Sequence, residues 1–202
     1  MHISEGVLSG PVLISGGALA AVGTAIGLKK LDYDRIAQAG ILSAAFFVAS
    51  LIHVPIGPAN AHLILNGVVG LLLGWAAFPA ILVALVLQAV LFQFGGITAL
   101  GVNTIIMALP AVFCYFMCSP FLHKKSALAL TAAFACGFLS VALSALILAL
   151  ALVFTEENFF EVSAIVIAAH IPVMIIEGLV TAMCVAFLKK VQPSMLPGFS
   201  KQ

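Results

Sequence analysis

Three of the five histidines in this 202-residue chain stand in segments that could form one metal site. His2 follows Met1, and His53 and His62 enclose the sequence VPIGPANA. The α-amine of Met1, the amide nitrogen of His2 and the His2 imidazole can close two fused chelate rings, and the planar peptide keeps these nitrogens in one plane. A fourth nitrogen, for which His62 is the candidate, would complete the square that Ni(II) and Cu(II) favour in nitrogen-rich sites.

Polar side chains near the predicted turns could support such a site. The candidates are His53, Asn60, Asn66, Gln93 and Asn103. His53 could orient the loop or hydrogen-bond a ligand, and either asparagine near His62 could fix the tautomer of that imidazole. Gln93 and Asn103 flank one predicted turn and could hold the N-terminal segment in place.

The composition predicts an all-α integral membrane protein. Hydrophobic residues make up 64% of the chain and charged residues 7%, whereas roughly 25% of an ordinary soluble domain is charged. From Ile36 to His123 there is no Asp, Glu, Lys or Arg. A bilayer needs about 20 apolar residues per helical span, and the alternation typical of a membrane β-barrel is missing. We therefore expect a lipid bilayer around the chain and no nucleic-acid partner.

The positions of the basic residues predict the topology. They fall in four groups: Lys29, Lys30 and Arg35; Lys124 and Lys125; Lys189 and Lys190; and Lys201. If every group is cytoplasmic, as the positive-inside rule requires, one span precedes the first group, four fit before the second and two before the third. The prediction is about seven transmembrane helices, with the N-terminus outside and the C-terminus cytoplasmic.

One transmembrane domain is expected over residues 1–202. Residues 1–6 would form an N-terminal metal-binding loop, 7–190 the helical bundle and 191–202 a cytoplasmic tail. The expected helices cover about 7–28, 36–51, 62–79, 80–94, 103–122, 127–154 and 162–188. Asn60 is a suitable N-cap for the third of these helices.

Small residues dominate the first predicted helix. Gly16, Ala20 and Thr24 form one stripe at four-residue spacing, and Gly17, Ala21 and Ala25 form another. Small residues at this spacing allow a second helix to approach closely. The stripes are explained equally well by packing inside the bundle or by docking of a separate membrane subunit. The residues favoured for docking are Gly16, Ala20, Ala21 and Thr24.

The opening MHISEGVLSG resembles the N-terminal motif of the substrate-binding subunits of cobalt/nickel energy-coupling factor transporters, the CbiM/NikM family. The segments IHVPIGPANAHLILNG, GLLLG and LQAVLFQFGGITALGVN also resemble that family, and the similarity covers most of the chain. The resemblance implies that a free N-terminus folds back into a bundle of seven helices. It also implies that the metal is held by the Met1 amine, the amide and imidazole of His2, and His62.

The resemblance further implies a substrate and partner proteins. Its substrate would be Ni2+ or Co2+, with no bound organic cofactor. Its partners would be a transmembrane coupling subunit, ATPase subunits and a small accessory membrane protein in the bacterial cytoplasmic membrane. The sequence has no GxxxxGK[ST] motif, so the chain itself is expected to be a non-catalytic subunit that depends on other chains for ATP hydrolysis.

His170 and Glu177, which share a face of the last predicted helix, leave two other functions open. An ionisable residue within a span is a functional candidate. The pair could couple protons to solute movement in a secondary transporter. An intramembrane metalloenzyme using His53, His62 and His170 is the second alternative, although the HExxH motif is missing. A buried structural hydrogen bond is the simpler interpretation of Glu177.

Overall fold

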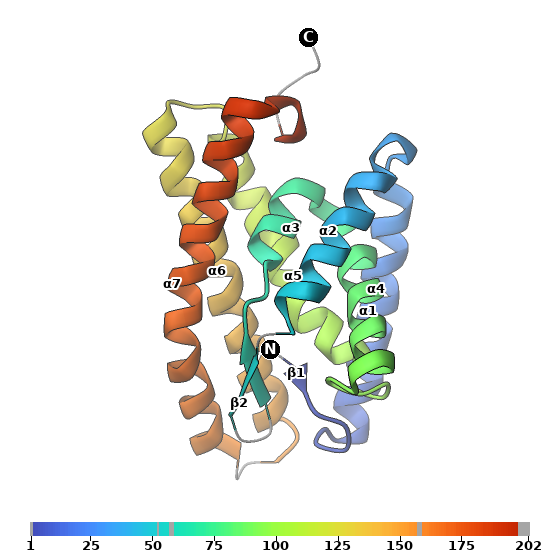
Figure 1. Cartoon of the computed structure of the whole chain (residues 1–202). Coiled ribbons are helices and arrows are strands. Elements are labelled where there is room, and N and C mark those ends of the chain that lie inside the picture. The colour runs from blue at the N-terminus through green and yellow to red at the C-terminus, as the bar shows by residue number, and fades with distance from the viewer. Residues whose placement is uncertain (1, 52, 57–58, 157–158, 198–202) are drawn as a thin grey trace.

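The computed structural model describes residues 2–51, 53–56, 59–156 and 159–197, with the backbone alone for 53–56 and 59–61. Seven α-helices lie within this part of the chain (Figure 1). They are α1 (Gly10–Lys30), α2 (Ile36–Ala49), α3 (Asn66–Leu73), α4 (Ala77–Phe92), α5 (Leu100–Cys118), α6 (Ser126–Val153) and α7 (Phe160–Val191). The helices are apolar nearly all round, which is the pattern of a membrane bundle rather than of a soluble one.

Five helical stretches within the described residues are long and apolar enough to cross a membrane. These are Gly10–Lys30, Asn66–Phe92, Leu100–Phe121, Ser126–Val153 and Phe160–Val191. The 14-residue α2 is shorter than a span requires. The expected count of about seven transmembrane helices is therefore not confirmed, although the bundle does contain seven α-helices in its described part.

The stretch Asn66–Phe92 is bent back on itself. Gly74 has a φ of 56° and begins the 3-10 turn η2 (Gly74–Ala76), where the chain reverses. The Arg35 guanidinium donates a hydrogen bond of 2.7 Å to the Leu72 carbonyl, so the start of α2 lies beside the end of α3. The Ser43 hydroxyl donates to the Ala80 carbonyl at 2.7 Å, so α2 and α4 then run side by side. The eight-residue α3 rises only about 12 Å and faces the opposite way to α4 (Figure 1).

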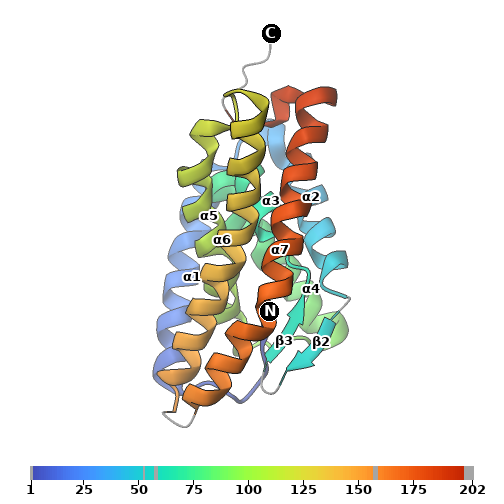
Figure 2. The ribbon, with the colours of Figure 1, turned by 90° about the vertical axis from the view of Figure 1, so that its left-hand side faces the viewer.

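Basic residues gather at one end of the bundle. The last turn of α1 carries Lys29 and Lys30, and the last turn of α7 carries Lys189 and Lys190. The Lys189 ammonium donates to the carbonyls of Leu122 and Lys124, at 2.9 and 3.2 Å, and so ties the turn before α6 to the end of α7. The start of α1 and the turn between α6 and α7 lie at the opposite end (Figures 1 and 2).

A three-stranded antiparallel sheet interrupts the helical bundle, so the all-α prediction is wrong in this region. The strands β1 (His2–Ile3), β2 (His53–Ile56) and β3 (Ala59–His62) pair in the order β1-β3-β2. Asn60 lies inside β3, and α3 begins at Asn66 with Leu65 as its N-cap, so the expected capping role of Asn60 is also wrong. Local turn signals in HVPIGPANAH could not reveal this arrangement, because the third strand comes from the distant N-terminus.

The small-residue stripes of α1 divide between the interior and the surface. Gly16 is buried, and a Cβ atom added there would overlap the side chain of Val102 on α5. Ala20 is also buried, whereas Ala21 is exposed and Thr24 is half-buried. The prediction that Gly16 and Ala20 form a docking face is therefore wrong, since both pack inside the bundle.

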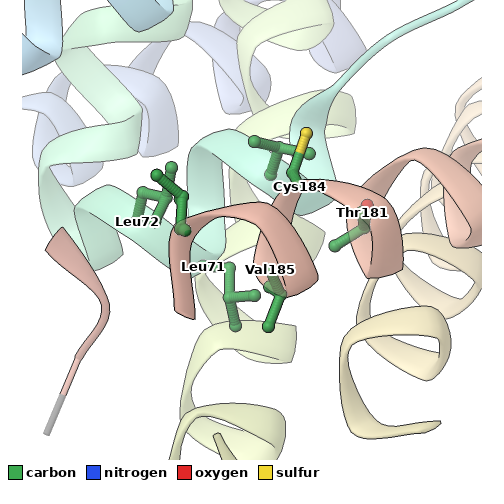
Figure 3. A pocket seen from close by; sticks show the side chains of 7 residues that line it. Leu71, Leu72, Thr181, Cys184 and Val185 are labelled. Atoms are coloured by element: carbon green, nitrogen blue, oxygen red, sulfur yellow. The ribbon is translucent and has the colours of Figure 1, made fainter. Parts of the chain in front are cut away.

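A narrow crevice separates α3 from the C-terminal half of α7 (Figure 3). Its labelled lining residues are Leu71, Leu72, Thr181, Cys184 and Val185. The space inside does not admit a water molecule. The crevice is therefore too small for a hydrated ion.

Candidate metal centre

The small sheet brings His2 and His62 together. His2 is paired with Asn60 across β1 and β3, and Asn60 lies two residues before His62 on the same strand. Because side chains alternate along a strand, positions 2 and 62 share one face of the sheet. The two imidazole rings lie 4.6 Å apart between centroids, and the side chains are only 1% and 3% exposed. Two imidazoles from distant segments thus meet in a buried position.

The protein sets the protonation of the His62 ring. Its Nδ1 lies 2.8 Å from the carbonyl oxygen of Leu63. A carbonyl only accepts, so Nδ1 carries the proton and Nε2 keeps its lone pair. The pKa of His62 is lowered to about 4, mainly by burial and to a smaller extent by the neighbouring His170, while the hydrogen bond to Leu63 acts in the opposite direction. His62 is therefore a neutral imidazole at neutral pH, which is the form that binds metal ions.

Asn103 on α5 holds the N-terminal strand. The Ile3 amide donates to Asn103 Oδ1 at 2.9 Å, and Asn103 Nδ2 donates to the Ile3 carbonyl at 3.1 Å. The side-chain amide thus replaces a neighbouring strand for Ile3, which is itself fully buried. The predicted position of Asn103 beside the N-terminal segment agrees with this geometry.

The turn between α4 and α5 forms hydrogen bonds with the segment that follows β1. The Glu5 carboxylate accepts hydrogen bonds from the Thr98 amide, at 3.3 and 3.4 Å, and from the Thr98 hydroxyl. Gly96 has a φ of 90°, and a Cβ atom at that position would overlap the Glu5 carboxylate. The second glycine of FGG is therefore required by both backbone conformation and close approach. Sequence reasoning did not assign these roles to Thr98 and Gly96, although two adjacent glycines in a turn were a signal.

Asn66 and Gln93 are two further residues that were predicted to support the site. Asn66 donates to Ser144 Oγ at 3.0 Å and to the Met107 carbonyl at 3.3 Å, and it accepts from Ser140 Oγ at 3.1 Å. Its amide joins the start of α3 to α5 and α6, while the Leu63 carbonyl sets the His62 tautomer. Gln93 ends α4 in a left-handed conformation with an exposed side chain.

The predicted ligand Met1 and the predicted supporting residues His53 and Asn60 are described only in part or not at all. His53 is paired with His62 in the backbone register of β2 and β3, and Asn60 with His2. Their side chains, and Met1 as a whole, lie outside the described residues.

Two buried polar residues of α7 lie near the site. His170 is fully buried, contributes to the electrostatic environment of His62 and contacts the Val166 carbonyl through Nδ1 at 2.6 Å. Glu177 is also fully buried and accepts hydrogen bonds from the amides of Ile64 and Leu65, the latter at 2.6 Å. These bonds agree with the simpler interpretation of Glu177, in which the carboxylate has a structural role.

The site contains two buried imidazoles, those of His2 and His62, close to the N-terminal end of the chain. Among the residues that the structure describes, no group of three or more His, Cys, Asp or Glu side chains is arranged to hold a metal ion. A further ligand beside His2 and His62 would have to come from the backbone or from residues outside the described part of the chain. The alternative of a metalloenzyme using His53, His62 and His170 is not tested, since the His53 side chain lies outside the described residues.

The bundle with its buried N-terminal strand belongs to a defined class of multi-pass membrane proteins, those that transport transition metals. The chain is a member of the family described as the cobalt uptake substrate-specific transmembrane region, whose sequence profile matches residues 2–195. The resemblance stated from the sequence motifs is thus confirmed.

Relatives and solved structures agree with this membership. A protein of Haemophilus influenzae whose name refers to metal transport is 39% identical over 97% of this chain and 97% of its own length. The cobalt transport protein CbiM of Sorangium cellulosum is 29% identical over 97% of this chain and 94% of its length. The crystal structure of a truncated transition metal transporter superposes with a TM-score of 0.79 at 28% identity, covering 94% of this chain and 99% of the other.

Proposed function

We propose that this protein is the substrate-capture subunit of an energy-coupling factor importer for Ni2+ or Co2+. The metal ion is its cargo. In the proposed site the ion is held in a square plane by the α-amine of Met1, the imidazoles of His2 and His62, and the amide nitrogen of His2, which releases its proton as the ion binds.

One observation carries this proposal: the buried imidazoles of His2 and His62 lie 4.6 Å apart between centroids. Two rings at this separation can occupy adjacent corners of a square around one ion. The remaining two nitrogens of the proposed site are the amide of His2 and the amine of Met1. Both are covalently connected to the His2 ring, so they would approach the ion from the same side as that ring. Burial excludes competing water, and the neutral His62 ring requires no proton to leave before it binds.

The donor set favours some ions over others. A planar nitrogen site disfavours Zn(II), which takes tetrahedral ligation, and disfavours Mg(II) and Ca(II), which take oxygen ligands. Names among the relatives include both metals: cobalt for the Sorangium cellulosum protein, and nickel for a fused protein of Rhodobacter capsulatus that is 42% identical over 54% of this chain and 33% of its own length. We propose nickel or cobalt as the substrate on these two grounds together.

The proposed orientation places the metal centre at the outer face of a bacterial cytoplasmic membrane. It is supported by the concentration of lysines at the far end of the bundle, where α1 and α7 terminate. The sheet that carries both histidines lies toward the opposite end, beside the N-terminal half of α7 (Figure 2). An ion captured from outside would then be released toward the lysine-rich end.

Transport against a gradient requires partners in this proposal. They are a transmembrane coupling subunit, ATPase subunits and a small accessory membrane protein. The exposed stripe of α1, formed by Gly17, Ala21 and Ala25, is the proposed docking face for the coupling subunit, since Gly16 packs against α5 and Ala20 is buried.

Metal analysis of the purified protein, beside a variant with one extra N-terminal residue, tests the proposed site. The parent protein should carry about one nickel or cobalt ion per chain and show a visible absorption band of a planar nitrogen field. The extended variant should carry none, because the α-amine is displaced from its chelate ring. Equal metal content in the two proteins would refute the N-terminal chelate.

A further inference from the structure

Three residues between β3 and α3 belong to neither element. Leu63, Ile64 and Leu65 connect His62 to the first turn of α3, and Leu65 has a φ of 58° in the left-handed region. Ile64 is fully buried. The amides of Ile64 and Leu65 have no strand or helix to pair with, and an unsatisfied amide in a membrane interior costs several kcal/mol. The turn therefore needs an acceptor from elsewhere in the fold.

Glu177 on α7 supplies that acceptor. Its Oε1 receives both amide hydrogens, that of Ile64 and, at 2.6 Å, that of Leu65. Its Oε2 has no hydrogen-bond partner among the described residues. Burying a carboxylate without a full set of partners is costly. Its presence between α7 and this turn indicates that the turn has to be held at a defined position.

The helices around Glu177 fix its position. A Cβ atom at Gly137 on α6 would overlap the Glu177 carbonyl and the Thr181 hydroxyl, so α6 and α7 touch at this level. Gly67, in the first turn of α3, packs directly on Gly137. Toward the C-terminus of α7, the contact between α3 and α7 opens into the crevice shown in Figure 3. The Glu177 carboxylate thus forms a polar link from α7 to the turn that leads into α3, next to this crevice.

We propose that Glu177 is a positioning residue for His62, a role that rests on the proposed function of the metal site. The carboxylate holds Ile64 and Leu65, and the intervening Leu63 provides the carbonyl that fixes the His62 tautomer. A shift of this turn moves the imidazole and its hydrogen-bond acceptor together. Groups that orient a metal-binding histidine from behind typically contribute 10- to 100-fold to affinity.

Three substitutions at Glu177 distinguish the effect of its hydrogen-bond acceptor from the effect of its charge. Glu177→Gln keeps an acceptor oxygen at the same reach, Glu177→Asp keeps the charge but shortens the reach, and Glu177→Met keeps the size but loses the acceptor. Glu161, exposed in the first turn of the same helix, provides the matched control Glu161→Gln. Metal-free full-length protein labelled with 15N-histidine gives signals from only five imidazoles, and His62→Ala assigns the one of interest.

The histidine signals of the metal-free proteins test the positioning role independently of metal binding. We expect the Glu161→Gln and Glu177→Gln proteins to keep the parental His62 signal. In the Glu177→Asp and Glu177→Met proteins that signal should change, and hydrogen exchange at residues 63–65 should accelerate. An unchanged His62 signal in the Asp variant would overturn the proposal, as would a Gln variant that loses the signal. The Asp and Gln variants decide the matter even where the Met variant does not fold.

Metal titration provides the second measurement. Loss of the acceptor should weaken Ni2+ binding roughly 10- to 100-fold and shift the visible absorption band, with binding by the Gln variant within about threefold of the parent. Parental affinity in the Asp and Met variants, despite an altered His62 signal, would also overturn the proposal. A parent protein that binds no Ni2+ would sink the proposed function, whereas the His62 signals of the metal-free variants would still report on Glu177.

Discussion

The side chain of Asn103 forms a reciprocal pair of hydrogen bonds with the main chain of Ile3, at 2.9 and 3.1 Å. This arrangement is that of one strand residue facing another, although Asn103 lies in the first turn of α5. A membrane helix thereby completes the edge of a strand that β3 pairs on its other side.

Replacing Asn103 by Ala should loosen β1 and weaken metal binding. Both bonds are lost and the buried amide and carbonyl of Ile3 remain unsatisfied, which costs about 1–3 kcal/mol for each group. We expect Ni2+ affinity to fall roughly 10- to 100-fold in an equilibrium titration. Gln93→Ala, at an exposed side chain on the same turn, is the control and should bind like the parent. Equal losses in the two variants would show that the turn as a whole, rather than the Asn103 amide, matters.

Replacing His62 by Ala should remove a ligand while leaving the bundle folded. The expected loss of affinity exceeds about 100-fold, since groups that only orient a ligand already contribute 10- to 100-fold. His123→Ala, at an exposed position just before α6, is the control. The measurement is metal content after purification, together with the thermal unfolding midpoint of each protein. Retention of the ion by the His62 variant would exclude this residue from the site.

Adding bulk at Gly16 should destabilise the fold itself. Gly16→Leu forces α1 away from Val102 on α5, and overpacking of this kind typically costs 1–3 kcal/mol. A lower unfolding midpoint in detergent is the expected result, with or without any partner subunit. A Gly16→Leu protein as stable as the parent would show that α1 shifts without cost.

Adding bulk at Ala21 should act on assembly alone. Because Ala21 is exposed, Ala21→Leu should leave the unfolding midpoint and the metal content unchanged. Co-purification of the coupling subunit should decrease if the exposed stripe of α1 is the docking face. Normal assembly of the Ala21→Leu protein would place the docking face elsewhere on the subunit.

The sequence predicted the longer helices well, because they are apolar segments bounded by polar or turn residues, whereas the helix expected over 62–79 was wrong in extent, since α3 has only eight residues. The expected helices at 127–154 and 162–188 differ from α6 and α7 by only a few residues. The sheet could not be predicted, because β1 has two residues and no pattern of its own. Its partner β3 carries polar residues in a segment where two prolines indicated only a turn.

The candidate site was predicted only in part, because residue types identify side chains but not the backbone groups around them. His2 and His62 could be named from their chemistry and from the resemblance, and the structure brings them together. The groups that hold them are mostly backbone atoms, such as the Leu63 carbonyl and the amides of Ile64 and Leu65. Backbone groups are present at every position, so residue types cannot reveal which of them contribute.

The partnership between β1 and Asn103 determines when the site can exist during synthesis. The first strand leaves the ribosome before any residue that pairs with it, and its contacts with residues 59–60 and 103 close long loops. Such non-local contacts form slowly and late, because the entropy of loop closure has to be overcome first. A chain released after α4 would therefore be a helical membrane protein that lacks the Asn103 contact of the N-terminal strand. Metal binding would then mark chains whose insertion has proceeded through α5, and the last helix, which holds the turn behind His62, would complete the site.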